Sequence, residues 1–322
     1  MMMLLAVLLA WGVLAPASLP GSSGGLLLIG GALIGMPHGS SDFVVAHQFL
    51  GPRLRGWWFP AFLAGYLLVT AGMLIGWHLV PVGTFALFLF ISGLHFGAGE
   101  DGVTRSCGAT IRWFTRAATP IAPIFLGHPA AVAGIVGLMT GQPAAAVVST
   151  LEQCRIPGLA LSATLLACTV AGAVAKRQRA RSTVRSREAV ELILLSIAAI
   201  LLPPLLAFAM YFCLLHAVRH MASLGQRAFP KDGHAALKLV TAIVLPSALV
   251  CSLVLGLAWD AVAGVLSTEH LLAWALQVTA SLTVPHVMLE WCVGRAAVKA
   301  GVATPNPSGS IWSFAQTAAK QS

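Results

Sequence analysis

Long apolar runs dominate the chain, and the short stretches between them carry most of its charge. A helix needs about 20 apolar residues to cross the ~30 Å hydrocarbon core of a bilayer. The runs therefore predict an all-α polytopic transmembrane helical bundle of about 8–10 helices, with ten favoured. The expected spans lie near residues 3–19, 24–50, 57–79, 82–98, 118–140, 158–175, 189–203, 204–223, 236–258 and 268–293.

Two points in this pattern are open. The only break between the seventh and eighth spans is Pro203–Pro204, so these residues form either two helices or one kinked helix. The first 18 residues resemble a signal peptide, but they lack its basic start, and we interpret them as the first membrane helix. We expect residues 1–295 to form one integral membrane domain and residues 296–322 to form a loose cytoplasmic tail.

Composition supports a membrane class. The chain is 58% hydrophobic and 9% charged, with a mean hydropathy of +0.87, which excludes an ordinary soluble domain. The net charge of +9 does not indicate nucleic acid binding, because the basic residues lie between apolar runs and do not alternate with exposed aromatic residues. With ten spans, every basic residue except Arg155 falls on the face that carries both termini. This bias predicts cytoplasmic termini. Six cysteines without a CxxC pair indicate neither a disulfide framework nor a zinc ribbon.

Histidines inside the apolar runs are the main chemical signal. His216 and His220 stand four residues apart in YFCLLHAVRH, so one helix face can present both to a metal. His95 lies near the end of the fourth span, and His38 lies in GMPHG, where proline and glycine predict a broken helix. An ionisable residue is costly in a membrane and indicates a functional site. The other histidines that we considered, His47, His78, His234 and His270, lie near loops or helix ends and are interpreted as ordinary structural residues.

Four neutral imidazoles suit a first-row transition metal, including ferrous iron, copper and zinc. Acidic residues near the candidate ligands, Asp42, Glu100 and Asp101, could hold the second ring nitrogen of a ligating histidine. Glu290 follows His286 by four residues, so this pair can also share a helix face. The alternative for Asp42 and Glu290 is a structural charge network with Arg219.

These motifs, in this order, resemble the Brp/Blh family of bacterial and archaeal β-carotene 15,15'-dioxygenases. The resemblance spans roughly residues 30–292, and no single motif is specific by itself. The matching residues are Pro37, His38, Gly39 and Asp42, then Ser92, His95, Phe96 and Gly97, then Leu215, His216, Arg219 and His220, and finally Pro285, His286 and Glu290.

The resemblance implies an Fe(2+) ion held by His38, His95, His216 and His220. It implies cleavage of the central double bond of β-carotene with O2 into two retinal molecules, in a bacterial or archaeal cell membrane, without an organic cofactor or an obligate protein partner. Asp42, Glu100, Asp101, Tyr211, Arg219, His286 and Glu290 are candidates for supporting the ligands or contacting the substrate. Aromatic residues beside the ligands line a substrate tunnel or pack the core: Phe43, Phe96, Tyr211, Phe212 and Trp291.

Two other classes remain. A membrane desaturase or hydroxylase would need about eight histidines in HxxxH and HxxHH clusters, and the chain has no HxxHH. A proton or metal transporter would use the same buried histidines and aspartates as a relay, with paired broken helices in two similar halves. No such internal similarity is visible in the sequence.

Overall fold

The computed structural model describes Gly39, His234 and residues 42–98, 107–175, 182–220 and 268–299. Within these residues every regular element is a helix, so the all-helical expectation is confirmed for this part of the chain. The expected spans at residues 3–19 and 236–258, and most of the span at 24–50 that precedes Asp42, lie outside it.

The chain divides into two compact units. The first unit comprises Met1–Leu27 and Leu89–Leu215, and the second comprises Leu28–Phe88 and His216–Ser322. Within the described residues, two helical segments carry the chain from one unit to the other, namely α5 (Pro81–Ala98) and the segment Pro204–His220.

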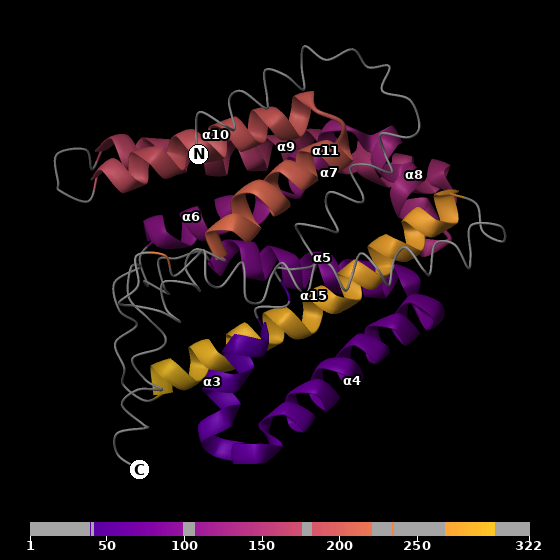
Figure 1. The fold of residues 1–322 in the computed structure, drawn as a ribbon. Coiled ribbons are helices and arrows are strands. Elements are labelled where there is room, and N and C mark those ends of the chain that lie inside the picture. Colours follow the sequence, from indigo (N-terminus) through magenta and orange to yellow (C-terminus); the bar gives the residue numbers. More distant parts are fainter. Residues whose placement is uncertain are drawn as a thin grey trace. The chain divides into compact units, whose positions relative to one another are not determined.

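In the first unit one long helix, α9, packs against four others. Helices α6, α7, α8 and α10 all contact it, and α10 runs beside α9 near the top of Figure 1. The bounds are α6 (Cys107–Ala118), α7 (Ala122–Gly127), α8 (Pro129–Thr140), α9 (Ala144–Ala175), α10 (Ser182–Leu201) and α11 (Pro204–Ala209).

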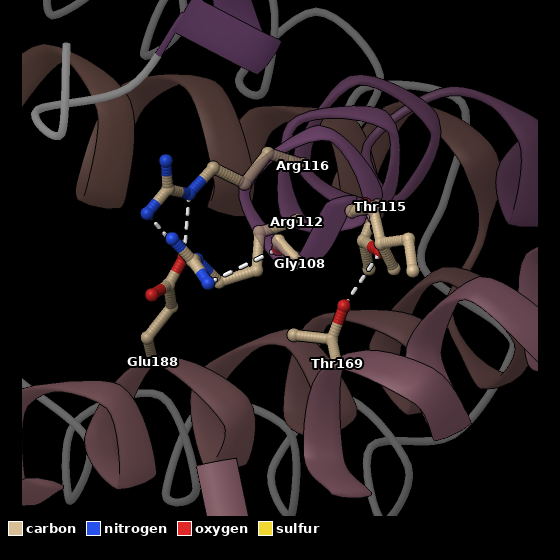
Figure 2. A network of polar contacts seen from close by, with 7 residues as sticks. Gly108, Arg112, Thr115, Arg116, Thr169 and Glu188 are labelled. Carbon is tan, nitrogen blue, oxygen red and sulfur yellow. Dashed lines mark hydrogen bonds and ion pairs between the residues drawn. The ribbon is translucent and has the colours of Figure 1, made fainter. Parts of the chain in front are cut away.

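Polar side chains tie α6 to its neighbours, as Figure 2 shows. Thr115 Oγ1 lies 2.8 Å from Thr169 Oγ1 of α9, and Thr115 is only 1% exposed. Arg116 Nε donates a hydrogen bond of 2.5 Å to Glu188 Oε1 of α10, and both side chains are largely buried. The threonine hydroxyls lie away from water and must be satisfied within the protein, and the two contacts together hold α6 against α9 and α10.

Prolines interrupt the first unit where hydrophobicity alone predicts continuity. The expected single span at 118–140 is wrong, because α6 ends at Ala118 and the rest forms two short helices that separate at His128. His128 precedes Pro129 and has φ −130° and ψ 53°, outside the helical region. The proline ring sterically disfavours the helical conformation for the residue before it.

The Pro203–Pro204 pair separates two helices. Helix α10 ends at Leu201, and α11 begins at Pro204 after Pro203 in an extended conformation with ψ 141°. Proline is favourable at the first position of a helix because no N–H is needed there. Of the two readings that the sequence left open, two helices is therefore the one observed.

Helix α9 begins earlier than hydrophobicity predicts. The expected span at 158–175 starts at Ala144, so Arg155, which was expected in a loop, lies on the helix. Its guanidinium is 3.2 Å from the carboxylate of Glu152, three residues earlier on the same helix. Opposite charges three residues apart stabilise a helix, so this ion pair is consistent with a continuous α9.

The second unit contains α3 (Asp42–Leu54), the 3-10 turn η1 (Arg55–Trp57), α4 (Trp58–Leu79), the first part of α5 and α15 (Thr268–Lys299). Helix α15 packs against α4 and α3, and Figure 1 shows its yellow and orange ribbon alongside α4. The expected spans at 57–79 and 82–98 are confirmed to within one residue at each end. The span expected at 268–293 begins as predicted and continues to Lys299.

Three helical stretches in the described part of the chain are long and apolar enough to cross a membrane: Asp42–Leu79, Pro81–Ala98 and Ala144–Ala175. On α4 the side chains of Leu67, Leu68 and Ile75 are 55%, 75% and 57% exposed. Exposed apolar surface on this scale is unfavourable in water and is the normal lipid-facing surface of a membrane helix. These helices indicate a membrane protein.

We expect a sharp contrast between two glycines of α5. A Cβ added at Gly97 would lie 2.7 Å from Trp113 Cε2, whereas one at Gly93 would have no neighbour nearer than 4.0 Å. Gly97→Ala should lower the free energy of unfolding by ~1–3 kcal/mol through overpacking. The matched Gly93→Ala should raise it by ~0.5–1 kcal/mol, because alanine restricts the unfolded chain. Unfolding in detergent monitored by circular dichroism measures both, and an unchanged or raised stability for Gly97→Ala would contradict the packing described.

Candidate metal centre

The middle of α15 presents two groups that can bind a metal. His286 and Glu290 are four residues apart, so both lie on one face of the helix. Pro285, immediately before His286, lies inside the helix, where it lacks the N–H of a normal helical residue and crowds the preceding turn. Contacts from neighbouring helices must therefore stabilise α15 near Pro285.

Helix α4 supplies that support through two hydrogen bonds. Trp77 Nε1 donates to Ser281 Oγ over 3.2 Å, and the Tyr66 hydroxyl donates to the carbonyl oxygen of Leu282 over 3.1 Å. Ser281 is fully buried and Trp77 is 5% exposed. These bonds fix the position of α15 along α4 in the turn that precedes His286.

Helix α3 contacts the same imidazole directly. His286 Nδ1 lies 2.7 Å from Asp42 Oδ1, and the two residues are 4% and 1% exposed. With Asp42 ionised, Nδ1 carries the proton and donates to the carboxylate. Any bond from this ring to a metal then uses Nε2, because a histidine that donates from one nitrogen coordinates through the other.

The segment from Met210 to His220 brings two more imidazoles into the second unit. It is π-helical over Met210–Ala217 and continues as a helix to His220. The rings of His216 and His220 are stacked, with centroids 6.3 Å apart and an interplanar angle of 23°. A π-helical stretch inserts extra backbone into a helix and often occurs at functional sites.

His220 connects this segment to α15. Its Nε2 lies 3.2 Å from Glu290 Oε1, and its ring centroid lies 5.4 Å from that of His286, edge to face. His286 and Glu290 also offer ligand atoms within 4.8 Å of each other. The second unit thus brings together His216, His220, His286, Glu290 and Asp42.

This set of donors fits a transition metal. Imidazole nitrogens with a neighbouring carboxylate oxygen are typical ligands of first-row divalent metals. Both carboxylates contact imidazoles, which is the arrangement that orients ligating histidines in metal sites. The chemistry of the residues present is therefore compatible with the iron that the family resemblance implies.

The first unit holds two further candidates. His95, on the second half of α5, is 9% exposed, and its ring centroid is 5.9 Å from that of Phe96. Phe96 packs edge to face on Tyr211, with centroids 5.0 Å apart. His95 and Tyr211 thus flank the same buried phenylalanine.

Most of the remaining candidate residues are either exposed or outside the described part of the chain. Arg219 is exposed on the helical segment, and Phe43 is 44% exposed and packs on Trp58. His47, His78, His234 and His270, interpreted as structural, are all exposed. Three candidates lie outside the described residues: His38, Glu100 and Asp101.

Sequence reasoning did not identify Tyr66 or Trp77 as positioning residues for α15. A usable signal was present for Tyr66, because the chain has only two tyrosines and this one lies within an apolar helix. A buried phenol usually needs a hydrogen-bond partner. Its acceptor, the Leu282 carbonyl, is 216 residues away and could not be identified from local spacing.

Comparison with known proteins adds independent evidence. Residues 29–292 match the family model described as beta-carotene 15,15'-dioxygenase. The chain is 27% identical over 248 residues to the probable beta-carotene 15,15'-dioxygenase Blh of Halobacterium salinarum, which covers 71% of each chain. It is also 27% identical over 192 residues to the beta-carotene 15,15'-dioxygenase of uncultured marine bacterium 66A03, covering 59% of this chain and 65% of the relative. No solved structure matches the chain. Because the family model matches most of its length, the chain belongs to the beta-carotene 15,15'-dioxygenase family.

Proposed function

We propose that this protein is an iron-dependent dioxygenase that cleaves β-carotene at its central 15,15' double bond and releases two molecules of retinal. The observation that carries the proposal is the cluster of carboxylate-paired imidazoles, Asp42–His286 and Glu290–His220, inside a helical unit with an apolar outer surface. Membership of the family supports the same reaction, because both relatives carry that activity in their names.

The proposed iron ligands are the imidazoles of His38, His95, His216 and His220. Neutral ligands leave the positive charge of the ion undiminished, and four of them leave one or two positions of an octahedral ion open. Bound iron would supply the site at which O2 binds and reacts. The protein itself would orient the ligating imidazole rings. The Glu290 carboxylate, 3.2 Å from His220 Nε2, restrains the orientation of that ring.

The substrate also fits this environment. β-Carotene is a long apolar polyene that dissolves in the bilayer, so entry from the lipid requires no desolvation of polar groups. The apolar outer surface of α4 is suited to such lateral entry. Edge-to-face aromatic pairs, Phe43–Trp58 in the second unit and Phe96–Tyr211 in the first, are our candidates for contacts with the polyene.

The proposed reaction balances without a further reductant. The central carbon–carbon double bond breaks, and each of its carbons receives one oxygen atom of O2 as an aldehyde oxygen. The protein must hold the polyene in a single register, although each dispersion contact contributes only ~0.1–0.2 kcal/mol. Many wall residues must therefore act together to distinguish neighbouring double bonds.

Removal of a ligand should abolish both metal binding and activity. We expect His216→Ala to purify without bound iron and without cleavage activity, because it deletes one of two ligands on a single helical segment. His78→Ala, which removes an exposed histidine of α4, is the control and should retain both. Elemental analysis and a retinal assay on the same preparations measure the two properties. Retention of iron and activity by His216→Ala would refute the ligand assignment.

The products test the position of cleavage. Purified protein with β-carotene and O2 should give retinal as the only aldehyde, with two molecules formed for each β-carotene consumed. Central cleavage of a symmetric polyene gives two identical halves, whereas any other bond gives halves of unequal length. Chromatography of the products separates these cases, and apocarotenals of unequal length as the main products would count against central cleavage.

A further inference from the structure

The second unit contains a buried imidazole that the four-histidine set does not use. His286 is 4% exposed and lies edge to face with His220, at a centroid distance of 5.4 Å. It is therefore a neighbour of one proposed ligand, on the helix that also carries Glu290. The question is whether the Asp42–His286 pair only ties α3 to α15 or also serves the metal.

A purely structural role for the buried Asp42–His286 pair would carry a high desolvation cost. Burial of an ionised carboxylate carries a large desolvation penalty, and a well-packed apolar pair often gives equal or greater stability. Neutral hydrogen bonds from Trp77 and Tyr66 also hold α15 in the second unit, and they carry a smaller desolvation penalty. A histidine with a carboxylate on one nitrogen is, by contrast, the usual arrangement of a metal ligand.

The direction of the ring supports the same reading. The Asp42 carboxylate contacts Nδ1 of His286, so Nε2 lies on the edge of the ring that faces away from this carboxylate. His286 and Glu290 have ligand atoms within 4.8 Å of each other, and Glu290 Oε1 is 3.2 Å from His220 Nε2. His286, Glu290 and His220 are therefore neighbours in the second unit.

We propose that His286 is an additional metal ligand, bound through Nε2, and that Asp42 is its positioning residue. The inference rests on the proposed function in that it requires iron beside His216 and His220, but it does not depend on which carotenoid is cleaved. Glu290 remains the carboxylate that orients His220.

Anaerobic titration of the metal-free, full-length protein with Fe(II), in competition with a coloured chelator, tests the proposal. Asp42→Asn should weaken Fe(II) binding by ~10–100-fold, and His286→Ala by at least as much. Thr115→Ala is the control, because it removes a buried hydrogen bond to Thr169 in the first unit. It should lower the unfolding midpoint and leave the Fe(II) affinity unchanged.

The Co(II)-substituted protein provides a second measurement. The visible ligand-field bands of Co(II) should shift in His286→Ala, and added imidazole should restore them and part of the lost affinity. If His286→Ala does not fold, the nearly isosteric Asp42→Asn carries the test through its affinity and its Co(II) spectrum. Wild-type affinity and spectrum in both variants, with only a lower unfolding midpoint, would show a structural tie and overturn the proposal.

The outcomes separate this inference from the proposed function. Loss of Fe(II) in His216→Ala but not in His286→Ala overturns the additional ligand alone. Weakened binding in His286→Ala, together with apocarotenals of unequal length from the wild type, supports the additional ligand and overturns central cleavage. A wild-type protein that binds no Fe(II) overturns both.

Discussion

The hydrogen bond between Asp42 and His286 Nδ1 joins the start of α3 to the middle of α15 across 244 residues of sequence. Its length of 2.7 Å is in the range of charge-assisted bonds, and both residues are almost completely buried. Because removal of one partner leaves the other polar group buried and unsatisfied, such pairs typically cost ~3–5 kcal/mol to break. The contact holds α15 in one register against α3, and Glu290, one turn further along, is thereby placed beside His220.

The rest of the second unit is organised around this polar centre within apolar surroundings. Inward-facing residues of α4 supply the hydrogen bonds to α15, while Leu67, Leu68 and Ile75 of the same helix are exposed. A helix with polar tips directed to a neighbour and leucines directed outward suits a lipid environment. The same surface that lets the helix lie in a membrane therefore suits an apolar substrate delivered from that membrane.

Much of this fold follows from local sequence properties. The spans of α4 and α5 were predicted within one residue, because uninterrupted apolar runs of the right length determine membrane helices. The 118–140 span was mispredicted because hydrophobicity is insensitive to the steric effect of Pro129 on His128. The early start of α9 was also missed, because the Glu152–Arg155 pair makes a charged stretch compatible with helix.

Several candidate residues lie together in the second unit, but their pairings could not be predicted from the sequence. The spacing of His216 and His220 indicated a shared helix face, and their rings are stacked. Spacing also placed Glu290 one turn from His286, but it gave no means of finding that Glu290 contacts His220 or that Asp42 contacts His286. These partners come from different helices, and a period of 3.6 residues carries no information about which helices pack together. The roles of all the candidate residues stay predictions, and His38, Glu100 and Asp101 also lie outside the described residues.

X-ray absorption at the iron edge of the purified, iron-loaded protein tests the proposed ligand set, because it reports the atoms bound to the metal. We expect a shell of nitrogen and oxygen atoms, accompanied by the outer-shell scattering that is characteristic of several imidazole rings. A shell that contains sulfur, or one without imidazole scattering, would contradict the proposed ligand set.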